Sequence, residues 1–231
     1  MSETQSQVIP AVGMPPEEQK AILELYDRLE RIDHYALLGV AATDDIKTIK
    51  RAYFQKAKEH HPDRWFRKDV GALKPKIDAI FAALAKAEAT LGNATERAAY
   101  DAYLSARLKT RMHRRQASAL EAAKEWKQAA EIWGRVVEQL PTDAYVQHRY
   151  AYTLLRAGIE HPLAIAAAQR AIELDSTRAD YRITAASLHL AEGHDRTALA
   201  QLALACELAP DRPDLAGLHA ALTERVARLR E

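Results

Sequence analysis

His61, Pro62 and Asp63 form the short stretch whose residue types best suit recognition of another protein. The aspartate can accept a charge-assisted hydrogen bond from an Arg or Lys of a partner. The proline restricts the loop and so lowers the entropy lost when the loop is bound. A given tripeptide arises by chance in a chain of this length with a probability on the order of a few per cent, so the segments around it decide its meaning.

The segment before the tripeptide is expected to be a basic helix. Thr43 can cap it, with Asp44 and Asp45 in the first turn. Pro62 prevents the helix from continuing much beyond Glu59. The basic residues of this segment are Lys47, Lys50, Arg51, Lys56 and Lys58, against the single acid Glu59. Such an excess of positive charge can steer an acidic partner surface. On their own these lysines would indicate a solvated helix face, but beside the tripeptide we favour a docking surface.

A second amphipathic helix is expected from about Pro75 to Leu91, stopped by Gly92 and Asn93. Its apolar face should hold Ile77, Ile80, Phe81, Leu84 and Leu91. A short helix at 96–103 should follow. Between the two long helices, 65–73 is expected to be a loop or a loosely helical insert. Its Trp65 and Phe66 can form a hydrophobic plug over the helix pair or an extra partner contact, and we favour the plug.

The second half of the chain has the pattern of a helical repeat. Pro141 and Pro210 are separated by two periods of about 34 residues, with one insertion near Pro162. Small residues are expected where helices approach closely, at Ala117, Ala151 and Ala186, and turns are expected at Gly158 and Gly193. This period suits antiparallel helix pairs stacked into a solenoid, with a last helix at 215–229 covering the final pair. The apolar residues of that helix are Leu218, Leu222, Val226 and Leu229.

Two further blocks flank the tripeptide. Asp33, His34, Tyr35, Ala36, Leu37, Leu38, Gly39 and Val40 stand upstream, and Glu96, Arg97, Ala98, Ala99, Tyr100 and Asp101 stand downstream. With the tripeptide between them, they resemble the J domain of DnaJ-like cochaperones over about 70 residues. The resemblance implies a four-helix domain whose middle helices are antiparallel and whose exposed tripeptide triggers ATP hydrolysis by a DnaK-type chaperone. The chaperone-binding residues are then expected to be Lys47, Lys50, Arg51, Tyr53, Lys58, His61, Pro62 and Asp63.

Some positions depart from the usual DnaJ-like pattern. Phe54 follows the tyrosine of the basic helix where a basic residue is usual, and Gln55 comes next. Lys56 and Glu88 replace an apolar and an aromatic residue, and we expect these two side chains to pair. The loop after Asp63 is also longer than in DnaJ itself. These departures bear on partner specificity.

The repeats are similar to tetratricopeptide (TPR) repeats, an interaction scaffold. The residues expected in the partner-binding groove are Arg114, Ser118, Tyr145, His148, Arg149, Tyr152, Arg156, Asp180 and Thr184. Some TPR domains hold the C-terminal carboxylate of a chaperone with a fixed Lys and Asn set. Here Asp180 would repel a carboxylate, so we do not expect that mode. Trp126 and Trp133 are expected to fill space between helices.

Other functional classes find little support. Cys206 is the only cysteine, so no intramolecular disulfide or cysteine-based zinc site can form. His60, His61 and Asp63 surround a proline and are not expected to converge on a metal. No phosphate-binding glycine loop or serine nucleophile motif occurs, so we expect no catalytic residues and no cofactor. The formal net charge of +1 and the absence of a recognition module argue against nucleic acid. No segment of roughly 20 apolar residues predicts a membrane span, and cytoplasm is the expected location.

The expected organisation is all-α: a four-helix J domain followed by a TPR-like helical-hairpin solenoid with a C-terminal capping helix. The boundaries are a disordered leader at 1–15, a helix at 16–32, the J domain at 33–105, and about three repeats with the cap at 106–231. Two functions remain. The chain can be a cochaperone that recruits a DnaK-type ATPase to a client or partner held by the repeats. Alternatively, it is a scaffold whose J domain is inactive or only docks.

Overall fold

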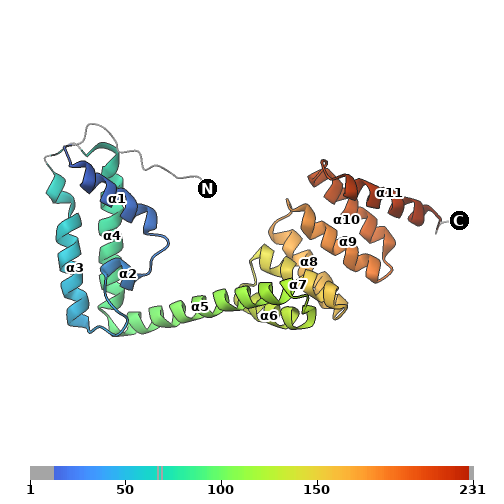
Figure 1. Ribbon diagram of the computed structural model, residues 1–231, viewed down its shortest axis with the longest axis horizontal. Coiled ribbons are helices and arrows are strands. Elements are labelled where there is room, and N and C mark those ends of the chain that lie inside the picture. Colours follow the sequence, from blue (N-terminus) through green and yellow to red (C-terminus); the bar gives the residue numbers. More distant parts are fainter. Residues whose placement is uncertain (1–12, 67, 69, 229–231) are drawn as a thin grey trace. The chain divides into compact units, whose positions relative to one another are not determined.

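The structure is a computed structural model that describes residues 13–66, 68 and 70–228. Over these residues the chain forms eleven α-helices and two short 3₁₀ helices and no strand (Figure 1). The all-α class is therefore confirmed. The chain divides into two compact units, Met1–Ser105 and Ala106–Glu231.

The first unit is built around an antiparallel pair, α3 (Ile46–His60) and α4 (Lys74–Leu91), joined by the 3₁₀ helices η1 (Pro62–Trp65) and η2 (Gly71–Leu73). The helices α1 (Pro16–Arg28) and α2 (His34–Leu38) both pack against α4. The most deeply buried side chains of this core are Leu38, Ile49, Leu73, Ile80, Leu84 and Leu91. Packing of α3 on α4 thus fixes the position of the loop between them, which carries the tripeptide.

The beginning of α3 differs from the expectation. Asp45, not Thr43, is its N-cap, and the Asp45 carboxylate accepts the backbone N–H of Thr48 at 2.7 Å. Asp44 lies outside the helix and accepts the N–H of Ala41 at 2.8 Å. Aspartate caps a helix at least as well as threonine, and a cap two residues later moves the start of the helix to Ile46.

The expected leader also needs correction at its end. Residues 1–12 of the expected disordered segment 1–15 lie outside the described residues. Met14, however, is 4% exposed and belongs to the core of the first unit. Its carbonyl accepts a hydrogen bond from the buried side-chain amide of Gln19 at 3.0 Å. The chain is thus packed against the first unit from Met14 onward, and α1 shares the core through Ile22 and Leu23.

The helix after α4 is much longer than expected. Asn93 caps it by accepting the backbone N–H groups of Thr95 at 2.9 Å and Glu96 at 3.2 Å. The helix, α5 (Ala94–Ala122), then runs for 29 residues, in place of the short helix expected at 96–103. Since 94–122 contains no Gly or Pro, nothing in the sequence interrupts its hydrogen-bond ladder.

The second unit is a series of helical hairpins. Its helices are α6 (Trp126–Gln139), α7 (Ala144–Ala157), α8 (His161–Leu174), α9 (Ala179–Ala191), α10 (Asp195–Leu208) and α11 (Pro213–Arg228). The last turns of α5 pack on α6, α7 on α8 and α9 on α10, while α11 covers α10. The three alanines expected at close helix contacts, Ala117, Ala151 and Ala186, are all buried.

The turns and the cap largely agree with the repeat pattern. Gly158 and Gly193 both have positive φ, 66° and 73°, in the turns after α7 and α9. Such a backbone is strained for residues with a side chain, which explains glycine at both positions. On α11, Leu222 and Val226 are buried, whereas Leu218 is exposed and does not belong to the apolar face. Leu229 lies outside the described residues.

Candidate functional site

The tripeptide lies where α3 ends and η1 begins. Pro62 forces His61 out of the helical region, to φ −65° and ψ 130°. The His61 Nδ1 atom then accepts the backbone N–H of Asp63 at 3.2 Å and lies 3.6 Å from the Asp63 carboxylate. The Asp63 side chain is 84% exposed, and the His61 side chain is about half exposed. The loop thus presents an exposed carboxylate on a backbone that its own neighbours hold in place.

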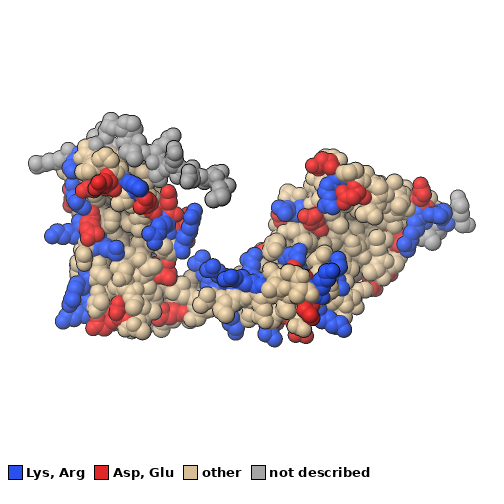
Figure 2. Space-filling view, viewed as in Figure 1, with Lys and Arg blue, Asp and Glu red and all other residues tan. Residues whose placement is uncertain are grey.

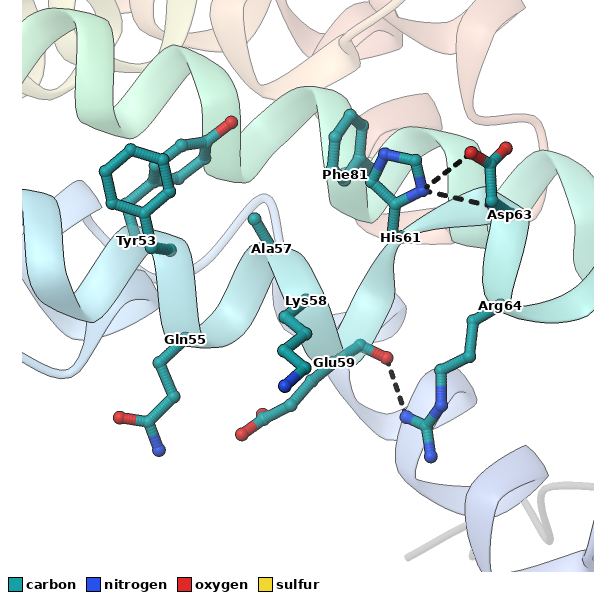
Figure 3. Close-up of a pocket in the computed structure, with 10 residues that line it drawn as sticks. Tyr53, Gln55, Ala57, Lys58, Glu59, His61, Asp63, Arg64 and Phe81 are labelled. Carbon is teal, nitrogen blue, oxygen red and sulfur yellow. Dashed lines mark hydrogen bonds and ion pairs between the residues drawn. The ribbon is translucent and has the colours of Figure 1, made fainter.

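A ring and a guanidinium hold the tripeptide from two sides (Figure 3). The imidazole of His61 meets the ring of Phe81 edge-on, with the ring centroids 4.9 Å apart. Phe81 is therefore only half-buried and partly faces the tripeptide, which corrects its placement in the core face of α4. Arg64 donates to the carbonyl of Glu59 at 2.9 Å and to the carboxylate of Glu18 on α1 at 3.3 Å. These contacts tie the loop to α1, α3 and α4.

The two aromatic residues that follow the tripeptide, Trp65 and Phe66, differ in burial. Trp65 is 4% exposed and packs into the core, as the plug interpretation expects. Phe66 is 85% exposed, so the plug interpretation is wrong for this residue. A hollow beside the loop is lined in part by Pro62, Asp63 and Phe66.

The basic residues of α3 lie on its exposed side. Lys47, Lys50, Arg51 and Lys58 are all exposed, and Figure 2 shows Lys and Arg side chains along this part of the first unit. Tyr53, in contrast, is half-buried and packs against the core. The expected pairing of Lys56 with Glu88 is not among the ion pairs of the described residues. The aliphatic end of Lys56 instead lies near Gly39.

A groove runs along α3 to the tripeptide (Figure 3). Its lining residues are Tyr53, Phe54, Gln55, Ala57, Lys58, Glu59, His61, Asp63, Arg64 and Phe81. Phe54 in this groove is 68% exposed. At the end of α3, burial lowers the pKa of the His60 imidazole. Lys56 and Arg64 lower this pKa further, while Glu59 raises it. His60 is therefore less readily protonated than an ordinary histidine.

The upstream and downstream blocks of the first unit meet each other at the other end of the helix pair. The Tyr35 hydroxyl donates to the Asp101 carboxylate at 2.7 Å, and Arg97 donates to the same hydroxyl at 3.0 Å. The Tyr100 hydroxyl accepts the backbone N–H of His34 at 2.9 Å, and their rings stack 4.4 Å apart. These residues therefore hold α2 on α5, and their role is structural.

Three of the charged residues expected in the groove of the second unit form ion pairs within the protein. Arg114 lies 3.4 Å from the Asp143 carboxylate and over the ring of Tyr145. Arg149 forms an ion pair with Glu121, a residue that the sequence did not single out. Asp180 pairs with Arg212 at 3.2 Å. Ser118 lines a small hollow with Arg114, Arg115, Trp133 and Tyr145.

The remaining expected groove residues fall into two sets. His148 and Thr184 are both buried, and the His148 Nε2 atom lies 3.0 Å from Thr184 Oγ1, so this contact connects α7 with α9. Tyr152 and Arg156 both contact Trp126, and the Arg156 guanidinium lies 4.7 Å from the Trp126 ring centroid. Trp126 is therefore only half-buried, whereas Trp133 fills the space between helices as expected.

Sequence reasoning missed several residues of both sites. Glu18 and Arg64, which clamp the tripeptide loop, are surface charges with no periodic signal. Glu121 accepts hydrogen bonds from both Arg149 and the indole N–H of Trp133, but nothing in its spacing marks it. Within the described part of the chain, no group of three or more His, Cys, Asp or Glu residues is arranged to hold a metal ion. No described helix has the length and apolar character needed to cross a bilayer.

Comparison with known proteins agrees with this geometry. The model of the DnaJ domain matches residues 33–101. Over 73 residues the chain is 40% identical to the curved DNA-binding proteins of Salmonella choleraesuis (strain SC-B67) and Escherichia coli O1:K1 / APEC. This match covers 32% of the chain and 22% of each relative, so the chain spans less than a quarter of their length.

Solved structures similar to this chain include two TPR domains. One is the TPR2B domain of yeast Sti1 in a pHsp70 complex, at 20% identity over 51% of this chain and 98% of that chain, with a TM-score of 0.47. The other is the Sgt2 TPR domain of Aspergillus fumigatus, at 12% identity over 52% and 81%, with a TM-score of 0.48. Residues 33–101 of the chain, with the exposed tripeptide and the two flanking blocks in contact, therefore match the DnaJ domain, and an array of helical hairpins follows them.

Proposed function

We propose that this chain is a J-domain cochaperone. Its first unit binds a DnaK-type chaperone and stimulates that chaperone's ATPase, while the helical hairpins bind a client or another partner protein. The observation that carries the proposal is the 84% exposed carboxylate of Asp63, held at the end of the basic face of α3. The chain supplies no catalytic group in this scheme, so the hydrolysed ATP belongs to the partner.

The geometry suits this role in two ways. The tripeptide is already fixed by Pro62, by the His61–Phe81 ring contact and by the Arg64 hydrogen bonds, so little entropy is lost on binding. The exposed cations of α3 attract an acidic surface and raise the association rate, and Asp63 then offers one charge-assisted contact. Charge steering and a single directed contact are thus separate functions of neighbouring residues.

The test is single-turnover ATP hydrolysis by a DnaK-type chaperone with and without the full chain. The wild-type chain should accelerate hydrolysis, and Asp63→Asn should abolish the acceleration. Asp27→Asn is the matched control, because it removes the same charge from an exposed residue of α1 outside the groove. Full acceleration by the Asp63→Asn chain would exclude the assigned role of the tripeptide.

One observation favours the alternative, an interaction scaffold whose J domain only docks. Phe54 stands on α3 where DnaJ-like domains usually carry a basic residue, Gln55 follows it, and both are exposed. A scaffold would bind a chaperone or another protein without changing its ATP hydrolysis. Binding without acceleration, across several DnaK-type chaperones, would therefore select the scaffold.

A further inference from the structure

Phe54 is an aromatic residue in the middle of the basic face of α3. Lys50, Phe54 and Lys58 follow each other at a spacing of four residues, so they lie on one side of the helix. All three are exposed, and 68% of Phe54 is accessible to solvent. A partner that docks on the lysines must therefore also cover this ring.

The ring also belongs to a groove with an apolar wall. Its neighbour Tyr53 lies 5.5 Å away between ring centroids, and the groove continues over Ala57 to Phe81. His61, at the far end, places its ring against Phe81. Charged groups stand around this apolar strip, with Lys58 and Arg64 on the same groove and Asp63 at its end (Figure 3).

This arrangement has the form of a binding centre in protein interfaces. An aromatic side chain that becomes fully covered contributes much of the affinity, while the charged residues around it exclude water and orient the partner. A single exposed aromatic residue is common on protein surfaces and by itself indicates nothing. Phe54 differs because it lies between two lysines, in a groove that ends at the tripeptide.

We propose that this groove receives an apolar side chain from an acidic surface of the DnaK-type chaperone, and that Phe54 is the main apolar contact of that complex. The inference rests on the proposed function and adds a partner chemistry to it. The acidic character of that surface follows from Lys47, Lys50 and Lys58, which are exposed on the same helix. The apolar contact does not depend on charge, so part of the affinity must persist when salt screens the lysines.

The experiment measures the Kd of the full chain for an ATP-bound DnaK-type chaperone at low and at high salt. Phe54→Ala should weaken binding about tenfold or more at both salt concentrations. Lys50→Glu should weaken binding strongly at low salt and much less at high salt, because screening removes its contribution. Phe54→Leu, which remains apolar, should keep most of the affinity.

Tyr103→Ala is the control, since it removes an exposed aromatic ring that does not line the groove. It should bind like the wild-type chain. If Phe54→Ala also binds like wild type while Asp63→Asn loses ATPase stimulation, the groove inference is wrong and the proposed function stands. If the wild-type chain neither binds nor stimulates any DnaK-type chaperone tested, both are wrong. Melting curves of the variants test for a loss of fold. No such loss is expected for the Phe54 variants, because Phe54 is exposed.

Discussion

His148 shows how folding changes the chemistry of a single residue in the second unit. Burial lowers the pKa of its imidazole to about 4, Asp180 opposes this shift and Arg178 adds to it. The ring is 8% exposed and stacks on the ring of Tyr181, with 4.6 Å between centroids. Its Nε2 atom lies within hydrogen-bond distance of Thr184. The folded state therefore favours the neutral form of the imidazole.

The stability of the second unit should consequently fall in mild acid. The folded pKa lies below the ordinary value of 6.5, so the unfolded chain binds the proton more readily. The contribution of His148 is complete above about pH 6.5 and is lost as the pH falls towards about 4, up to roughly 2–3 kcal/mol. Urea unfolding at pH 7 and pH 4.5 measures this loss. His148→Gln can still hydrogen-bond to Thr184 but does not titrate in this range, so it should show a smaller loss. An equal loss in both proteins would refute the assignment.

Phe81 and Ile80 are neighbours on α4 with different burial, and they give a second prediction. Ile80 is fully buried, whereas Phe81 is half-buried beside His61. Ile80→Ala should cost about 2–5 kcal/mol of unfolding free energy. Phe81→Ala should cost about 1–2 kcal/mol, below the range for a fully buried ring. Equilibrium urea unfolding ranks the two variants, and a larger loss for Phe81→Ala would contradict the structure.

Side chains in loops were the hardest to place from sequence. The tripeptide was identified correctly as the loop after α3, because Pro62 has a known local effect. Trp65 and Phe66 are both large aromatic residues of the same loop, yet Trp65 is 4% exposed and Phe66 is 85% exposed. A loop has no periodicity that assigns its side chains to faces, so only the tertiary packing separates them.

At the scale of elements, the periodicity of apolar residues predicted where helices occur but not where each helix ends. The two long helices of the first unit and the hairpins of the second follow from the spacing of apolar residues and from Gly158 and Gly193, whereas the antiparallel packing of the two long helices was implied by the resemblance to the J domain. The length of α5 did not, because the helix spans the end of one unit and the start of the next. No pattern of buried residues marks its middle part, and only the absence of Gly and Pro indicates its continuity.

The close packing of α9 gives a prediction for this scale. Ala186 is 3% exposed and lies in a core formed with residues of α10 and α11. Ala186→Leu should overpack this contact and destabilise the second unit by about 1–3 kcal/mol. Ala191→Leu makes the same change at an exposed position of the same helix and should leave stability within about 0.5 kcal/mol of wild type. Thermal unfolding distinguishes them, and equal melting temperatures for the two variants would show that α9 is not closely packed.

At the scale of the whole molecule, the buried apolar residues form separate clusters. One cluster, from Met14 to Leu91, is the core of the first unit, and three smaller clusters lie in the hairpins. The sequence predicted a division between 105 and 106 from the change to a repeat pattern. It also predicted a helix at 16–32, but the surface that α1 covers depends on packing between segments far apart in the chain.

The contribution of α1 to the first core leads to the last prediction. Met14, Ile22 and Leu23 are buried against a core that includes α4 and η2, although they precede the DnaJ domain match at residues 33–101. Burial of an apolar side chain contributes about 1.5–3 kcal/mol, and a small domain has only about 5–15 kcal/mol of stability. A fragment 13–105 should therefore unfold cooperatively in urea, and a fragment 30–105 should be less stable by several kcal/mol or remain unfolded. Fragment 13–105 with Ile22→Ala should lie between the two. Equal unfolding midpoints for 13–105 and 30–105 would show that α1 only covers a surface that is stable without it.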